Sequence, residues 1–363
     1  MEQLKQTLKE LSELNGAPGF EYDVCNYIIG EAKKLDINSY HVDNMGNLYI
    51  KIEGKNPKGP IAHLDAHMDE PCFIVQYIGD NGFVYIAPLG LISENIMMGT
   101  RVRIQTDKGN VNGCIGVRSY HLSNNEEKSK TLQYDDMWID IGADSREEVL
   151  EAGVKPGFPV LFDEPFRELL HNNVMSKAFD DRVGCAVLVE VMKSLVKEKP
   201  FSTVYLTFST QEELILRGSR VIFNGFKKFF ERIPDVSVVY DICLCGDVPK
   251  VKKNKAPVEL GKGVGIKLYD KSSASHYMHV VPRKIVNMME SLCINNNIPY
   301  QYDFLMGCTN GDLFALEDIG VLTGGISIPC RYTHSAIEIV NLNDVDNAFK
   351  LTLNFINNLN KLS

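Results

Sequence analysis

Long hydrophobic runs are missing from this chain, and no segment approaches the ~20 apolar residues that a membrane-spanning helix requires. The opening stretch MEQLKQTLKELSEL mixes both charges and lacks the apolar centre of a signal peptide. An excess of positive charge is also missing, because 38 Lys and Arg stand against 47 Asp and Glu, for a formal net charge of -9. These features argue against a membrane partner and against a nucleic-acid-binding protein, which normally presents a basic face.

The chain also lacks the regular cysteine pattern that is typical of a disulfide-linked protein. The nine cysteines are an odd number and are scattered along the chain, which predicts reduced thiols and a cytoplasmic location. Cys243 and Cys245 form a C-x-C motif that could bind a soft metal. Because side chains two residues apart point to the same face of a strand, we favour two ordinary strand residues.

What the chain does contain is an alternation of helix-like and strand-like segments. This alternation predicts an α/β fold with a mixed, mostly parallel central sheet flanked by helices. The predicted helices are 4–14, 22–35, 181–198, 280–297 and 343–362, and the predicted strands are 47–54, 59–69, 202–210, 235–245, 264–270 and 320–329.

Residues 71–165 have a different sequence pattern, in which short strand-like segments alternate with turns that contain Gly, Asn and Asp. A chain of 363 residues is long for one compact domain. We therefore expect a small β-rich domain, 71–165, inserted into an α/β domain formed by 1–70 and 166–363.

Histidines and acids gather at five strand ends or loops of the α/β part. Each group alone has an ordinary structural explanation, such as a surface pair, a helix cap or a loop acid. Ligands of open α/β sheets, however, bind beyond the carboxyl ends of strands. The groups are His67 with Asp69, Asp180 with Asp181, Glu212 with Glu213, Asp241, and His334.

Imidazole and carboxylate groups are ligands that suit zinc, cobalt or manganese. Two such cations would neutralise a cluster of this composition. A two-metal centre needs one carboxylate that bridges the ions and one free acid that takes a proton from water. The sequence thus predicts a metal-assisted hydrolase.

Several segments, in this order, resemble the M42 family of metallo-aminopeptidases over nearly the whole chain: APGFE, LDAHMDEPCFIVQYI, SKAFDDRVG, TQEELILRGS, YDICLCGDVP and ISIPCRYTHSAIE. The resemblance implies a di-zinc peptidase-like catalytic domain that removes amino-terminal residues from peptides. It implies two divalent metal ions per subunit. Zinc or cobalt is expected in preference to manganese.

The resemblance also assigns roles to the residues. It implies that His67 and Asp241 hold one ion, that Glu213 and His334 hold the other, and that Asp180 bridges them. It further implies that Asp69 orients His67, that Asp181 shapes the backbone beside the bridge, and that Glu212 is the general base.

For the inserted segment 71–165 the resemblance implies a PDZ-like dimerisation domain, and hence a dimer-based homo-oligomer of up to twelve subunits. His121 matches a histidine of that domain and receives no role. Pro71, Cys72, Asn310 and Asp312 depart from the family pattern, which puts substrate preference and assembly in doubt rather than catalysis.

Other functions remain open at this stage. The same two-metal chemistry would serve a deacylase or a carboxypeptidase, and some relatives are described as glucanases. A non-catalytic assembly protein is disfavoured, because every ligand position is intact. Four basic residues near the motifs could form a pocket for acidic substrates or could be structural: Lys177, Arg182, Arg217 and Arg331.

Overall fold

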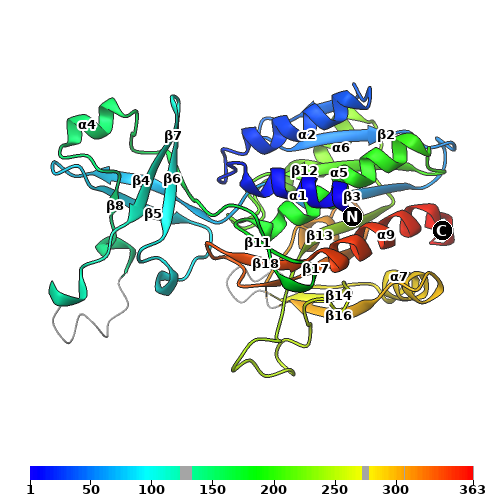
Figure 1. Ribbon diagram of the computed structural model, residues 1–363. Coiled ribbons are helices and arrows are strands. Elements are labelled where there is room, and N and C mark those ends of the chain that lie inside the picture. Colours follow the sequence, from blue (N-terminus) through cyan, green and yellow to red (C-terminus); the bar gives the residue numbers. More distant parts are fainter. Residues whose placement is uncertain (123–132, 272–277, 306, 363) are drawn as a thin grey trace.

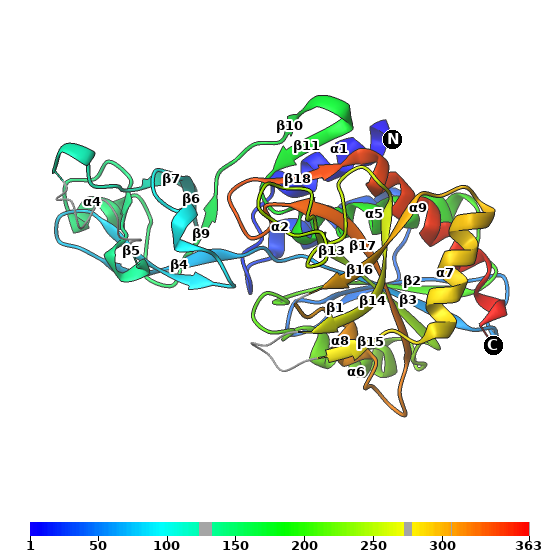
Figure 2. The same ribbon diagram turned by 90° about the horizontal axis from the view of Figure 1, so that it is seen from below.

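The computed structural model describes residues 1–122, 133–271, 278–305 and 307–362. Two parts lie side by side in Figure 1, an α/β body on the right and a β-barrel on the left. Figure 2 shows the same separation from below, so the barrel projects from one end of the body.

The helices of the described residues agree with the predicted ones and add several. Short helices α4, α6 and α8 were not predicted. The bounds are α1 (Glu2–Glu13), α2 (Tyr22–Lys34), α4 (Arg146–Glu151), α5 (Phe179–Lys197), α6 (Ser219–Phe229), α7 (Arg283–Asn295), α8 (Gly311–Phe314) and α9 (Leu342–Asn357).

The body is built on a 12-stranded sheet whose main path runs β1-β2-β12-β3-β13-β17-β18-β11-β10. Strand β14 pairs with β17 and carries β15 and β16. The bounds are β1 (Tyr40–Val42), β2 (Leu48–Ile52), β3 (Ile61–His67), β10 (Arg167–Glu168), β11 (Asn173–Ser176), β12 (Thr203–Ser209), β13 (Val236–Leu244), β14 (Val264–Lys271), β15 (Met278–Val280), β16 (Tyr300–Leu305), β17 (Leu322–Arg331) and β18 (Glu338–Asn341).

The predicted mixed sheet is confirmed, but antiparallel pairs are more numerous than the prediction of a mostly parallel sheet allows. Strands β12, β3, β13 and β17 pair in parallel with one another, as β14 does with β16. Antiparallel pairs extend the sheet on both sides, through β2 and β1 and through β18, β11 and β10. Within the pairs β1–β2, β10–β11 and β17–β18 the two strands follow one another along the chain without an intervening α-helix, which suits an antiparallel arrangement.

Helices cover both faces of the sheet, as the near-continuous burial of its central strands requires. Along β3, Ala62, Leu64 and Ala66 belong to the main core, which also contains the buried residues of α5. On the other face, Ile61 packs in a second cluster with Phe223 of α6 and other aromatic side chains.

The β-rich part is a closed barrel with its own core. Its strands run in the order β4-β5-β8-β7-β6-β9, and Phe73, Ile86 and Val102 are among the side chains that fill it. The bounds are β4 (Cys72–Ile78), β5 (Val84–Leu89), β6 (Arg101–Thr106), β7 (Gly109–Ile115), β8 (Ile139–Asp140) and β9 (Pro159–Phe162). The predicted β-rich domain is present as a six-stranded barrel. Its bounds, 71–165, and its PDZ-like dimerisation stay predictions.

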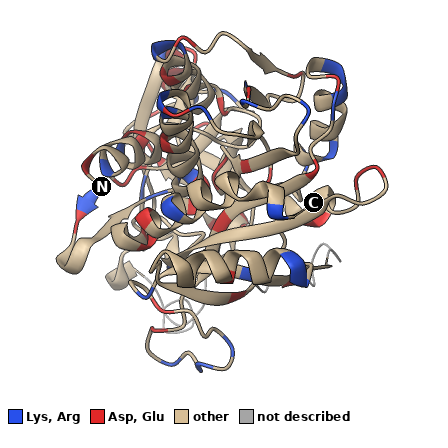
Figure 3. Cartoon of the chain, turned by 90° about the vertical axis from the view of Figure 1, so that its right-hand side faces the viewer, with Lys and Arg blue, Asp and Glu red and all other residues tan. Residues whose placement is uncertain are grey.

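The nine cysteines all lie within the described residues, and none of them takes part in a disulfide there. Cys243 and Cys245 pack with Val258 and Leu260 in a small apolar cluster, as strand residues. In the part of the chain that the structure describes, no helix combines the length and apolar character needed to cross a membrane. Figure 3 shows Lys and Arg interspersed with Asp and Glu over the side in view.

Candidate metal centre

The predicted ligands come together at the carboxyl ends of the central strands. His67 is the last residue of β3, Asp180 lies in the first turn of α5, and Glu213 follows β12. Ligand atoms of these three side chains all lie within 4.8 Å of one another. The parallel register brings them together, because Ser209 at the end of β12 pairs with His67.

Asp180 lies between two imidazole rings. Its Oδ1 is 3.2 Å from Nε2 of His67, and its Oδ2 is 3.3 Å from Nε2 of His334. Glu213 Oε1 is 3.6 Å from the same His334 nitrogen. Thr333 donates its hydroxyl proton to Asp180 Oδ2 at 2.9 Å. One carboxylate with a histidine on each side is the arrangement that a bridging ligand requires.

Asp241 is the remaining predicted ligand. It lies on β13, is 6% exposed, and accepts a hydrogen bond from the backbone N–H of Ile242 at 2.7 Å. Burial, and after it the charge of Asp180, raises the pKa of Asp241 well above its usual value. The charge of Asp180 acts on Asp241, but Asp241 is not part of the group of His67, Asp180 and Glu213 whose ligand atoms lie within 4.8 Å of one another.

Both histidines direct Nε2 into the centre because Nδ1 is occupied elsewhere. His67 Nδ1 is 3.2 Å from the backbone oxygen of Asp69 and 3.5 Å from Asp69 Oδ1. His334 Nδ1 donates to the backbone oxygen of Leu91 at 2.7 Å. A hydrogen bond at one ring nitrogen fixes the tautomer and frees the other nitrogen for a metal. Leu91 follows β5 of the barrel, so the inserted segment contributes a contact to the centre.

Asp69 does more than the sequence predicted. Its Oδ1 accepts from the backbone N–H of Glu212 at 2.9 Å, and its Oδ2 accepts from that of Glu213 at 3.0 Å. The same carboxylate thus holds the adjacent glutamates and faces His67. Among the described residues Glu212 Oε1 is buried without a hydrogen-bond partner. That oxygen is free to interact with a molecule that enters the centre.

The carboxylates repel one another at close range. Burial raises the pKa of Glu212 well above its usual value. The charge of His67 opposes this shift, and the charge of Asp241 adds to it. Burial, opposed mainly by His334, raises the pKa of Glu213 to about 7. Burial also works against the charge on Asp180, but hydrogen bonds from His334 and His67 outweigh it and lower the pKa of that carboxyl. Buried acids in excess over histidines favour added positive charge.

These residues fit divalent cations. The donors are imidazole nitrogens and carboxylate oxygens, both of which zinc accepts. Asp181 supplies a second buried oxygen, Oδ2, that has no hydrogen-bond partner among the described residues. Its Oδ1 accepts from the backbone N–H of Gly184 at 3.0 Å, and the Asp180–Asp181 peptide bond is cis. The fold and the donor set define a metal-dependent hydrolase of the α/β class.

Comparison with known proteins gives the family. The model of the M42 glutamyl aminopeptidase family matches residues 46–351, and the chain belongs to this family. The lysyl aminopeptidase of Pyrococcus furiosus is 28% identical over 95% of this chain and 94% of its own length. The predicted family and the predicted activity, that of a metal-dependent aminopeptidase, are confirmed.

Solved structures agree over nearly the full chain. Aminopeptidase APDkam598 from Desulfurococcus kamchatkensis has a TM-score of 0.89 and 32% identity, with 98% of this chain and 95% of that chain covered. The TET1 peptidase of Pyrococcus horikoshii, described as assembling into a tetrahedron or a large octahedral shell, has a TM-score of 0.83 and 29% identity, with 97% and 99% covered.

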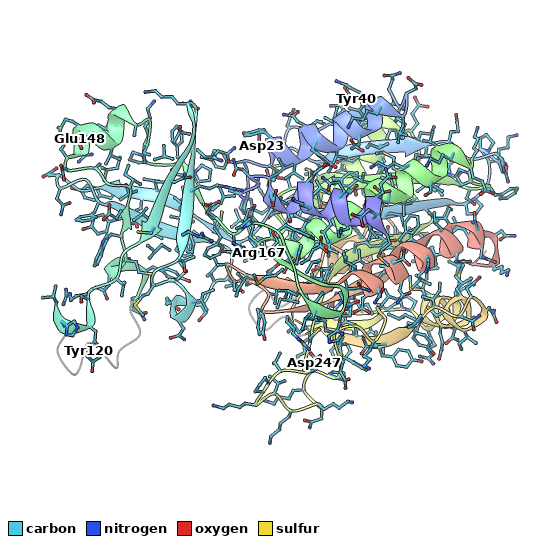
Figure 4. All side chains as sticks on the ribbon, viewed as in Figure 1. Asp23, Tyr40, Tyr120, Glu148, Arg167 and Asp247 are labelled. Atoms are coloured by element: carbon cyan, nitrogen blue, oxygen red, sulfur yellow. The ribbon has the colours of Figure 1, made fainter. Side chains whose placement is uncertain are left out.

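The four basic residues near the motifs have mostly structural partners. Lys177 Nζ lies 2.7 and 2.8 Å from the oxygens of buried Glu70, and Arg182 Nη2 lies 3.1 Å from one of them. Arg331 forms a two-point ion pair with Asp247, which Figure 4 labels at the lower edge of the body. Arg217 is exposed and donates to Gln211 Oε1 at 3.1 Å.

Sequence reasoning missed two buried glutamates beside the centre. Glu21, in the segment APGFE, accepts from the hydroxyl of Thr210 and from the backbone N–H of Gln211 at 3.0 Å. It thereby holds the residues that precede Glu212. Glu338 accepts from the backbone N–H groups of Asp180 and His334. Both glutamates lie inside segments that resemble the family, APGFE and ISIPCRYTHSAIE, and this position was the available signal.

Proposed function

We propose that the chain hydrolyses the first peptide bond of peptides with the help of two divalent metal ions at this centre. His67 and Asp241 would hold one ion, Glu213 and His334 would hold the other, and Asp180 would bridge them. Zinc or cobalt suits this donor set best, and manganese is also compatible. The observation that carries the proposal is the position of Asp180, with 3.2 and 3.3 Å contacts to the two histidines.

Divalent ions polarise a bound carbonyl and lower the pKa of water. The residues of the chain do the rest. Glu212 has a buried oxygen without a protein partner, so it can accept a proton from the attacking water and pass it to the leaving amine. The carboxylate of Asp69 fixes the position of Glu212, because it accepts a hydrogen bond from the backbone N–H of Glu212. The excess of buried carboxylates attracts the positively charged amino terminus of a peptide.

The test uses short peptides with either a free or an acetylated amino terminus. The protein is stripped of metal and then given zinc, cobalt or manganese. We expect metal-dependent release of the first residue from the free peptides alone. Cleavage of the acetylated peptides would indicate a deacylase or endopeptidase, and cleavage at the other end a carboxypeptidase. Cleavage of a cellulose-like polymer but of no peptide would indicate a glucanase. If the chain binds metal but cleaves nothing, it would be a non-catalytic protein.

We also propose that residues 1–70 and 166–363 form the catalytic domain and that 71–165 form a dimerisation domain of a cytoplasmic homo-oligomer. The described surface of the barrel exposes apolar side chains: Leu91 is 71% exposed, Tyr120 70% and Leu122 76%. Figure 4 labels Tyr120 at the lower end of the barrel. The tetrahedron or octahedral shell reported for the P. horikoshii relative supports a large homo-oligomeric assembly of this chain.

Light scattering on the purified chain tests the assembly. We expect a mass that is an even multiple of 40.8 kDa. Replacement of Tyr120 and Leu122 by serine should reduce that mass. A monomeric parent would refute the proposal.

A further inference from the structure

Glu338 is a buried carboxylate that joins two separate parts of the metal centre. It is 1% exposed and is the first residue of β18. Its Oε2 accepts from the backbone N–H of Asp180 at 2.9 Å, and its Oε1 accepts from that of His334 at 2.9 Å. One side chain thus binds the main chain of two metal-ligand residues that are far apart in the sequence.

The sheet explains how one residue reaches both. Strand β18 lies between β11 and β17, and Glu338 pairs with Ser176 at the end of β11. The chain leaves β11 toward Asp180, and it leaves β17 toward His334. Glu338 therefore stands at the edge where both ligand segments depart from the sheet.

Both amides need a partner from outside their own element. Asp180 is in the first turn of α5, where backbone N–H groups lack helical acceptors. Its φ of -78° and ψ of 108° are not helical. His334 has a φ of 58°, in the left-handed region that side chains other than glycine adopt rarely. Glu338 supplies the acceptor that each of these backbone conformations requires.

Asp69 forms the same kind of contact with another pair of residues, since its two oxygens accept from the backbone N–H groups of Glu212 and Glu213. Each of these two acids joins a pair of functional residues through backbone N–H groups. A ligand set held in this way needs less rearrangement when ions bind, and loss of such outer partners typically weakens metal affinity.

We propose that Glu338 is a positioning residue that sets the separation of Asp180 and His334 before metal binds. The inference rests on the proposed function, in which both residues are ligands. The 3.3 Å contact between Asp180 Oδ2 and His334 Nε2 is the distance that it maintains. Glu338 acts through these two residues and does not touch the reacting groups.

The test compares Glu338→Gln with a matched variant, Asp344→Asn. Asp344 is likewise a buried carboxylate that accepts from two backbone N–H groups, those of Gly261 at 2.6 Å and Gly263 at 2.8 Å. Its partners belong to the loop before β14 and are not predicted ligands. Each substitution exchanges one carboxylate oxygen for an NH2 group, which cannot accept from a backbone amide.

Zinc is titrated calorimetrically into the metal-free full-length chains, and cobalt spectra report the coordination geometry. We expect Glu338→Gln to bind zinc about 10- to 100-fold more weakly than the parent, with an altered cobalt spectrum. Asp344→Asn should lower thermal stability but keep parental zinc affinity. The activity deficit of Glu338→Gln should shrink as the zinc concentration rises.

Parental zinc affinity in Glu338→Gln would overturn the proposal, as would an equal loss in Asp344→Asn, which would indicate general destabilisation. If Glu338→Gln does not fold without metal, Glu338→Asp takes its place in the titration. The aspartate keeps the charge, but its side chain is one methylene too short to reach both amides. Parental affinity in that variant would also overturn it. Failure of the proposed function would be seen in a different measurement, in which the zinc-loaded parent cleaves no peptide.

Discussion

Replacing His63, a fully buried residue of β3, is expected to remove part of the loss of stability that acid causes. His63 Nε2 is 2.7 Å from Thr207 Oγ1, and its Nδ1 is 3.0 Å from Ser237 Oγ. Thr207 donates its proton to Asp65, so its oxygen accepts from His63 Nε2–H. Ser237 then donates to Nδ1. This chain of hydrogen bonds requires a neutral imidazole.

The magnitude follows from the pKa of this histidine. Burial lowers the pKa of His63 from 6.5 to about 3. Between these values the unfolded chain binds a proton that the folded chain does not, so the free energy of unfolding falls as the pH falls through 6.5 toward 3. At about pH 5 the loss due to His63 amounts to roughly 2 kcal/mol.

The assay is urea unfolding of the parent, His63→Gln and the surface control His121→Gln at about pH 7.5 and about pH 5. Because metal loss in acid affects all three chains, the comparison isolates the buried imidazole. We expect His63→Gln to be less stable at the higher pH but to lose about 2 kcal/mol less on acidification than the other two. An equal loss in all three chains would refute the reasoning.

The remaining predictions concern the centre and its support. Glu212→Gln should retain the metal content of the parent but lower kcat by about 10²- to 10⁴-fold, because only the base is lost; peptide hydrolysis near the parental rate would contradict this role. Asp180→Ala should bind neither ion, as measured by metal analysis after dialysis, and two retained ions would rule out a bridge. Gly16→Ala should lower the free energy of unfolding by about 1–3 kcal/mol, since the added Cβ would lie 2.0 Å from Nη2 of buried Arg182; Gly30→Ala, where nothing lies within 4 Å, is its control and should not destabilise.

Much of the body was predictable because its signals are local. Apolar periodicity located α1, α2, α5, α7 and α9, and continuous apolar runs located the central strands. The site residues stood out because acids and histidines follow such runs directly. Asp241 is the clearest example: a carboxylate within an apolar strand needs a partner or a ligand.

Features that depend on distant partners were not predictable. The short strands β11 and β18 pair although Ser176 and Glu338, two of the residues that pair, are 162 positions apart (338 − 176). Helix α6 contains Gly225, which weakens the helical signal but allows Tyr49 to pack where a Cβ would lie 2.4 Å from its ring. The contact of His334 with the backbone oxygen of Leu91 has no side-chain signature at all.

The most direct test of the central claim is a zinc titration of the metal-free chain, with the release of the first residue from an unblocked peptide followed at each addition. The two-metal account predicts that activity is absent without zinc and reaches its maximum when two ions are bound per chain. Full activity with one ion bound, or activity without any, would contradict it.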